Sequence, residues 1–252
     1  MKIVKLGAMA AILASGVIGM EAKAEETKTY NTNGDITFEQ STEPEQPVYP
    51  GDPNPETPVK PTDPTNPDGP GEGTQGPISI DYISSLDFGK QEISNKNQLY
   101  YAKPQSYQSG EEDSPNFMQV TDKSGKVAGW RLSVEQVTDF TAQSEDATNK
   151  TITGAKITLN AADGEITSNS NSPKPSARNI TLDGAGSSQA ILSAEAGAGA
   201  GLWTSTFGEL ETTDETVVNT GASLMIPGSS QTDADKYTTE LVWKIENVPG
   251  FE

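Results

Sequence analysis

Three tryptophans, Trp130, Trp203 and Trp243, are the side chains of this sequence with the most specific chemical potential. An indole ring with an open face offers an apolar platform on which the C–H face of a sugar ring can stack. Two of the three stand in similar strings, with a branched aliphatic residue two positions later, at Leu132 and at Ile245. Residues two apart lie on one face of a strand, so each string predicts a strand with a heavy apolar face.

The same strings also have a purely structural interpretation. A tryptophan that shares a strand face with leucine and valine usually belongs to the core, which favours a packing role for Trp130 and Trp243. Trp203 follows an Ala- and Gly-rich stretch, residues 193–201, which contains too much glycine for a stable helix. We therefore expect Trp203 to lie on a loop and to be the most exposed of the three rings.

Two cations alternate with the apolar residues of the strings. Arg131 follows Trp130, and Lys244 follows Trp243. Because successive side chains of a strand point to opposite faces, both cations are expected on the outward faces. They are candidate charged contacts for a ligand.

The composition removes most catalytic chemistry. The chain has no His and no Cys, so the commonest general base, the commonest metal ligand and all thiol chemistry are missing. A glycosidase needs two facing carboxylates, and the 36 acidic residues could supply such a pair by chance. No motif marks any two of them. We therefore expect no enzyme, no cofactor and no metal site.

The charge excludes several classes of partner. The formal net charge is −19, and the first 24 residues hold Lys2, Lys5, Lys23 and Glu21, so that their removal leaves −21. Such a chain should not bind nucleic acid, anionic lipid or bare polyanions such as teichoic acid.

The first 24 residues are typical of a secretory signal peptide. Lys2 and Lys5 precede an uncharged run, residues 6–20, and Ala-Lys-Ala at 22–24 forms a small-x-small cleavage site. The run is shorter than the roughly 20 residues that a spanning helix needs, which argues against a retained anchor. No lipid-modifiable Cys, sorting string or hydrophobic tail is found, so we expect a secreted chain without a covalent anchor.

Two polar segments follow the signal peptide. Residues 25–43 hold one weak alternating run, 35–38, which fits either a short strand or an irregular segment. Residues 44–77 contain eleven of the seventeen prolines, mostly spaced by three. That spacing matches the three residues per turn of polyproline II, which predicts a stiff spacer. A docking site for a proline-binding module is the alternative.

Residues 78–252 form the predicted folded domain. Apolar residues alternate with polar ones at 130–135, 155–159, 180–182 and 237–245, and Gly-containing turn signals separate these runs. No window shows a good helical period. The pattern predicts an all-β, antiparallel sandwich or barrel-like domain that is preceded by a Pro-rich linker.

The sequence resembles the WxL-domain cell-surface proteins of Gram-positive bacteria. The likeness rests on Leu-Asp-Phe-Gly at 86–89, Asp-Lys-Ser-Gly at 122–125, Gly-Trp-Arg-Leu-Ser-Val at 129–134 and the closing Trp-Lys-Ile at 243–245. The signal peptide and the Pro-rich segment fit the same arrangement. Ile245 stands where the family usually has leucine, and this conservative exchange suggests that the position fills space.

The resemblance implies a secreted protein that is retained at the cell surface by non-covalent binding to the cell wall, with peptidoglycan as the target. It also implies possible assembly with other surface proteins, or binding to host matrix, so a scaffold or adhesin is the alternative function. Nucleic-acid binding and membrane insertion are not expected. The candidate wall contacts are Trp130, Leu132, Trp243, Ile245, Trp203, Arg131 and Lys244.

Overall fold

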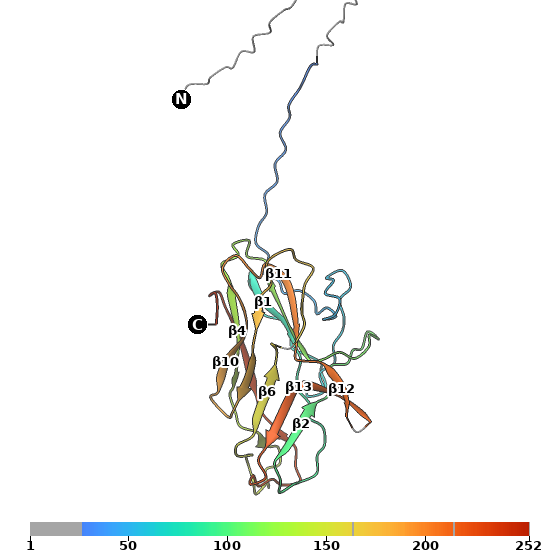
Figure 1. Cartoon of the computed structure of the whole chain (residues 1–252), viewed down its shortest axis with the longest axis vertical. Helices are drawn as coiled ribbons and strands as arrows, with labels where there is room; N and C mark the ends of the chain where they lie inside the picture. Colours follow the sequence, from blue (N-terminus) through green and yellow to red (C-terminus); the bar gives the residue numbers. More distant parts are fainter. Residues whose placement is uncertain (1–26, 163, 214, 252) are drawn as a thin grey trace, which may run out of the picture. The chain divides into compact units, whose positions relative to one another are not determined.

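Alternating apolar and polar residues form strands throughout the protein. The computed structural model describes residues 27–162, 164–213 and 215–251 (Figure 1). These residues contain no helix, and every pair of neighbouring strands among them is antiparallel. The predicted all-β, antiparallel fold is confirmed.

The predicted signal peptide, residues 1–24, lies outside the described residues. No helix of membrane-spanning length and hydrophobicity occurs in the part of the chain that the structure describes.

The described strands form three larger sheets and one small sheet. The first sheet has the order β1 (Ile78–Ile83), β3 (Phe117–Asp122), β11 (Gly201–Thr206), β7 (Ile166–Thr167). The second has the order β15 (Leu241–Glu246), β4 (Trp130–Gln136), β10 (Ser188–Ala194), β8 (Ser176–Ala177). The third has the order β12 (Leu210–Thr213), β13 (Thr216–Ile226), β6 (Lys156–Asn160), β9 (Asn179–Leu182), and β2 (Gln98–Ala102) also pairs with β13. The small sheet pairs β14 (Tyr237–Thr238) with β5 (Thr141–Ala142).

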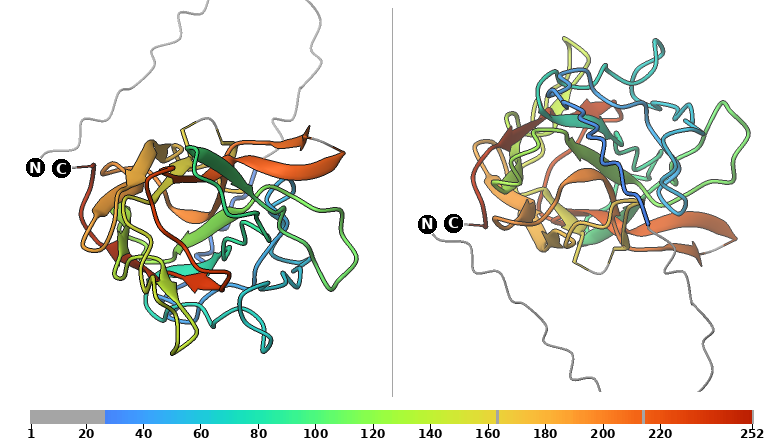
Figure 2. Two further views of the ribbon diagram at one scale, coloured as in Figure 1. Left: turned by 90° about the horizontal axis from the view of Figure 1, so that it is seen from below. Right: turned by 90° about the horizontal axis from the view of Figure 1, so that it is seen from above.

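One apolar core is shared by the three larger sheets. Figure 2, which looks along the long axis, shows their strands arranged around a common interior. The alternating runs predicted from the sequence supply the core with their apolar faces: every second residue of β4 is buried, as are Ile157 and Leu159 of β6 and Ile180 and Leu182 of β9. A single register slip would turn these residues outward, so the core fixes the pairing of the strands.

The Pro-rich segment is part of this folded body. Its prediction as a stiff, extended spacer over residues 44–77 is wrong, because the chain folds back on itself and buries Val48 and Val59. Val48 bridges Pro58, and the Val59 N–H donates to the Pro47 carbonyl at 2.8 Å. We call residues 44–62 the proline strap. Residues 39–252 belong to one compact unit, so no boundary at residue 78 separates a spacer from a domain.

A second apolar cluster explains why the strap packs. Val59 joins Tyr82, Tyr107 and Phe117 on the side of the first sheet that faces away from the main core, and Tyr49 packs against this group. Burying an aliphatic side chain of this size stabilises a fold by roughly 1.5–3 kcal/mol. The apolar residues between the prolines therefore outweigh the preference of the prolines for an extended chain.

A buried polar network ties the strap to the first sheet. Asp81 of β1 is only 3 % exposed, and its carboxylate accepts hydrogen bonds from the Glu45 N–H (3.0 Å), the Gln119 side-chain amide (3.1 Å) and the Thr121 hydroxyl (2.5 Å). The Gln119 amide oxygen in turn accepts from the Val48 N–H at 2.8 Å. Burial raises the pKa of Asp81, and these hydrogen bonds counter part of the rise.

The described residues before the compact unit, 27–38, contain neither helix nor strand. The short strand considered for residues 35–38 is not formed. Tyr30, Ile36 and Phe38 are highly exposed there.

Candidate functional site

The two tryptophan strings form neighbouring strands of one sheet. They make up parts of β4 and β15, and the antiparallel register places Leu132 opposite Ile245 and Val134 opposite Trp243. Strings that are more than a hundred residues apart in the sequence therefore pack side by side. This arrangement gives their shared apolar pattern a structural cause, because both strands turn the same kind of face toward the core.

Trp130 is enclosed completely. Its side chain is 0 % exposed, and its indole N–H donates to the Gly199 carbonyl at 3.0 Å. Gly199 has a φ of +76°, and a Cβ at this position would lie 2.7 Å from the indole nitrogen and 2.4 Å from the Ala194 Cβ. The Ala- and Gly-rich stretch thus lets the backbone approach the ring, as only glycine can. The ring of Trp130 is closed to a sugar.

The prediction that Trp203 is an exposed loop residue is wrong. It lies in β11, opposite Val120 of β3, and is only 4 % exposed. Its indole N–H donates to the Ala200 carbonyl at 3.1 Å. The Ala- and Gly-rich stretch ends as β11 begins, so pairing with β3 brings Trp203 into the core.

Trp243 keeps part of its surface open. It is half-buried, and its ring stacks on the buried Phe207 with a centroid distance of 6.4 Å and an interplanar angle of 22°. Tyr237, Leu241 and Ile245 are also half-buried and pack on the same core, which matches their shared parity in the sequence. Of the three tryptophans, Trp243 alone is accessible to a ligand, and only in part.

The outward cations of the strings are engaged across the sheet. Arg131 forms an ion pair with Glu246 at 3.0 Å, and Lys244 forms one with Glu135 at 2.8 Å. The hydrogen bond to Glu135 and its charge raise the pKa of Lys244. The prediction that both side chains point outward holds, but each already has an acidic neighbour.

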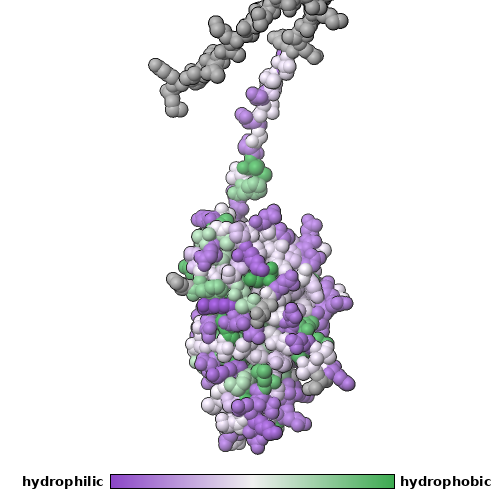
Figure 3. Space-filling model, in the orientation of Figure 1, coloured by the Kyte–Doolittle hydropathy of each residue, from purple (hydrophilic) through white to green (hydrophobic). Residues whose placement is uncertain are grey.

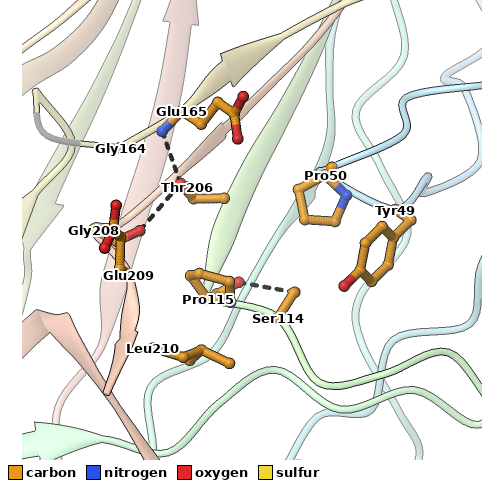
Figure 4. A pocket seen from close by; sticks show the side chains of 11 residues that line it. Tyr49, Pro50, Ser114, Pro115, Gly164, Glu165, Thr206, Gly208, Glu209 and Leu210 are labelled. Atoms are coloured by element: carbon orange, nitrogen blue, oxygen red, sulfur yellow. Dashed lines mark hydrogen bonds between the residues drawn. The ribbon is translucent and has the colours of Figure 1, made fainter.

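A shallow pocket of about 450 Å³ lies elsewhere on the body, beside the strap. Four separate segments line it, and Figure 4 shows them arranged around one space. The lining comes from residues 49–51 of the strap, 114–115, 164–165, and 206 with 208–210 around the turn between β11 and β12. None of these residues was among the sequence candidates.

The strap wall of the pocket is held by contacts of Tyr49 and Pro50, the first two residues of a tight turn. The Pro50 carbonyl accepts hydrogen bonds from the hydroxyls of Thr204 (3.2 Å) and Thr167. The Tyr49 ring packs against Tyr107 at a centroid distance of 5.6 Å. These contacts hold Tyr49 and Pro50 against the first sheet, so the pocket depends on the docked strap.

The opposite wall requires close backbone packing. A Cβ at Gly164 would lie 1.8 Å from the Thr206 carbonyl oxygen, which is a severe overlap. The Glu165 N–H donates to the Thr206 hydroxyl at 3.0 Å, and that hydroxyl donates to the Gly208 carbonyl at 3.3 Å (Figure 4). The start of β7 and the end of β11 are thus joined directly behind the pocket.

Carboxylates are the charged groups of the pocket. Glu165 and Glu209 are exposed at its rim, and no Lys or Arg lines it. In the part of the chain that the structure describes, neither carboxylate forms an ion pair or a hydrogen bond. The pocket therefore presents unpaired negative charge.

A nearby loop adds to the negative potential. Burial raises the pKa of the Tyr49 hydroxyl, and so do the charges of Glu112, Asp113 and Glu111, in decreasing order. These three acids follow one another in the chain. Their effect on Tyr49 shows that the field around this side of the pocket favours positive charge.

A second hollow, of about 410 Å³, lies between the approach to β1 and the end of β15. Pro77, Ile78 and Ile245 give it an apolar side, and Glu246 is its charged lining residue. Because Glu246 is paired with Arg131, this hollow has less unpaired charge than the first.

The described residues also contain no group of three or more acids able to hold a metal ion.

Sequence reasoning missed the pocket because its walls come together only in the fold. The one local signal was the Tyr-Pro-Gly-Asp turn at residues 49–52 inside the Pro-rich segment.

Comparison with known proteins gives one result. A family model described as WxL domain surface cell wall-binding matches residues 25–249. No curated protein and no solved structure gave a match.

Proposed function

Because the chain belongs to the family of WxL-domain surface cell wall-binding proteins, we propose that it binds the peptidoglycan of the wall directly and without a covalent bond. The match to the family over residues 25–249 is the observation that carries the proposal. Binding at the cell surface is the described property of the family. Peptidoglycan as the ligand, and secretion with cleavage after residue 24, are our additions.

Charge supports peptidoglycan over the anionic polymers of the wall. With a net charge of −19 over 252 residues, the protein repels phosphate-rich chains at long range. The face shown in Figure 3 is mostly hydrophilic, with hydrophobic residues in small separate patches. A surface of this kind suits a hydrated polymer better than a large apolar partner.

Most of the tryptophan strings support the fold in this proposal. Trp130, Leu132 and Trp203 are buried, so they act by holding the sheets together. Trp243 and Ile245 are the members that a wall polymer could touch at their exposed edges, together with the paired cations beside them. The family assignment favours a non-enzymatic surface protein, and no catalytic step is proposed.

Binding to partner proteins or host matrix is the second candidate function. The observation in its favour is the hairpin of β12 and β13. Among the described residues, β12 pairs only with β13 and is the edge strand of its sheet, and Val217 is exposed beside it. Edge strands offer unpaired backbone groups to another chain. Retention on cells only when other surface proteins are present would favour this function over direct wall binding.

Cosedimentation with purified walls tests the proposal. The full secreted chain is mixed with protein-free walls, once with teichoic acids present and once after their removal by acid. We expect saturable binding to both, and equal or tighter binding after removal because a source of repulsion is gone. Protein that stays in the supernatant with both preparations rules out direct wall binding. Binding that is lost on removal of teichoic acid rules out peptidoglycan as the ligand.

A further inference from the structure

We propose that the pocket beside the strap binds a primary ammonium group on a short aliphatic stem, such as a free amine of the wall polymers. The proposal rests on the proposed wall binding, and it names the chemical group that this one site would take. Its elements are the unpaired carboxylates of Glu165 and Glu209 and the apolar surface of Leu210 and of two strap residues, Tyr49 and Pro50.

Several of the hydrogen-bond donors around the pocket are already used within the protein. The backbone N–H groups of Gly164, Thr206 and Gly208 donate to the carbonyls of Ala161, Glu165 and Asn160. The Glu165 N–H and the Thr206 hydroxyl donate inside the wall of the pocket. The carboxylates of Glu165 and Glu209 remain as acceptors and the Tyr49 hydroxyl remains as a neutral donor, so the charged ligand that fits the pocket is one that donates.

An ammonium group fits this demand better than a carboxylate or a phosphate. It carries three N–H donors and no acceptor, and its positive charge matches the two carboxylates and the acidic loop at Glu111, Glu112 and Asp113. An anionic ligand would meet repulsion from these acids, which a neutral donor such as the Tyr49 hydroxyl would offset only in part. A neutral sugar could use the acceptors but would gain nothing from the charge.

The apolar part of the lining suits the stem of such a ligand. Lysine-like side chains lay their methylene groups along apolar surface while the charged end stays near water. Tyr49, Pro50, Pro115 and Leu210 provide such a surface, and Figure 4 shows them facing the space whose rim carries Glu165 and Glu209. The volume, about 450 Å³, falls within the range of small-molecule sites.

Cell walls offer this chemistry from two sources. One is the amine of an uncross-linked peptide in peptidoglycan. The other is the amine of alanine when it is esterified to teichoic acid. The charge of the protein favours the first, because the second is carried on a polyanion.

Chemically modified walls show whether binding depends on the charge of the wall amines or only on their shape, and they distinguish the two sources. The full chain is cosedimented with untreated walls, with walls whose amines are N-acetylated, and with walls whose amines are N,N-dimethylated and so remain charged. We expect acetylation to weaken binding about fivefold to tenfold, as for the loss of two exposed charge contacts, and dimethylation to preserve most of it. Mild alkali, which cleaves alanyl esters, should leave binding intact if peptide amines are the ligand. A loss after alkali would identify the esters as the source of the ammonium group.

Paired variants locate the contact. Glu165→Gln with Glu209→Gln removes two charges from the pocket, and Glu92→Gln with Glu240→Gln removes two from exposed positions outside its lining. We expect the first pair to weaken binding to untreated walls about fivefold to tenfold and to abolish the effect of acetylation, while the second pair changes neither. Thermal melts should be equal for both, since all four side chains are exposed.

The proposal is overturned if N-acetylated walls bind as tightly as untreated walls, or if the two pairs of variants behave alike. Absence of binding to untreated walls is a different result, because it removes the proposed function itself.

Discussion

At the scale of the residue, burial separates the tryptophans more clearly than their sequence context does. Trp130 and Trp203 are closed on all sides, and each indole N–H has a carbonyl partner. Trp243 is half-buried on Phe207. A side chain in the first situation contributes to stability, whereas one in the second can serve both stability and binding.

Truncation of these rings should follow the same order. Trp130→Ala should cost about 3–5 kcal/mol of unfolding free energy, a large share of the ~5–15 kcal/mol of a typical domain. Trp243→Ala should cost less, because part of that ring is already in water. Urea unfolding measures both. If Trp243→Ala melts like the wild type while wall binding disappears, the packing role assigned to Trp243 is wrong.

Substitution of two glycines in the Ala- and Gly-rich stretch distinguishes the cost of backbone strain from the cost of steric overlap. Gly197 and Gly199 both have positive φ values, +90° and +76°, but only at Gly199 would a Cβ meet other atoms. Gly197→Ala should therefore cost about 1 kcal/mol from the backbone alone. Gly199→Ala should cost clearly more, since Trp130 and Ala194 must move. Equal losses in urea unfolding would show that the backbone near Trp130 yields easily.

At the scale of the element, the proline strap is an integral part of the fold. Val48→Ala and Val59→Ala should each lower the unfolding free energy by about 1–3 kcal/mol, because both side chains are buried. Val217→Ala is the matched control: Val217 is 45 % exposed, and its change should stay within about 0.5 kcal/mol. A strap that acted only as a spacer would give three equal and negligible effects.

The Asp81 network gives the strap a pH dependence of definite sign. Burial raises the pKa of Asp81 above its ordinary value of 3.8, so the folded state binds this proton more tightly than the unfolded state. The contribution of Asp81 to stability is full below about pH 3.8 and is lost as the pH rises through the raised value. The stability of the wild type relative to Asp81→Asn should therefore fall from about pH 3 to about pH 7. Denaturant unfolding at several pH values checks this, and a relative stability that rises with pH contradicts it.

The alternation of apolar and polar residues was enough to predict several strands of the core. Alternation at 130–135, 155–159, 180–182 and 237–245 marked parts of β4, β6, β9 and β15 correctly, because one apolar face must be buried in any sheet. The strap was misjudged because the spacing of its prolines outweighed its apolar residues in the interpretation. Val48 and Val59 are buried against partners distant in the sequence, which no periodicity can reveal.

At the scale of the whole molecule, the residues that mark the family and the residues that line the pocket lie in different parts of the fold. The tryptophan strings that mark the family build adjoining strands of the core, and the unpaired carboxylates lie in a pocket formed by four distant segments. The candidate site could not be predicted from one sequence, because Tyr49, Glu165 and Glu209 meet only after the strap has docked. The fold class could be predicted from the sequence, because the alternating pattern of each strand is enough to indicate an all-β protein.

Non-covalent attachment to the wall is the central claim, and release followed by rebinding tests it most directly. Intact cells are extracted with concentrated denaturant, the released chain is refolded, and its binding to protein-free walls is measured over a range of concentrations. We predict that the denaturant releases the chain and that the refolded chain rebinds saturably. A chain that leaves the cell only after enzymatic digestion of the wall, or that refolds but does not rebind, would contradict the account.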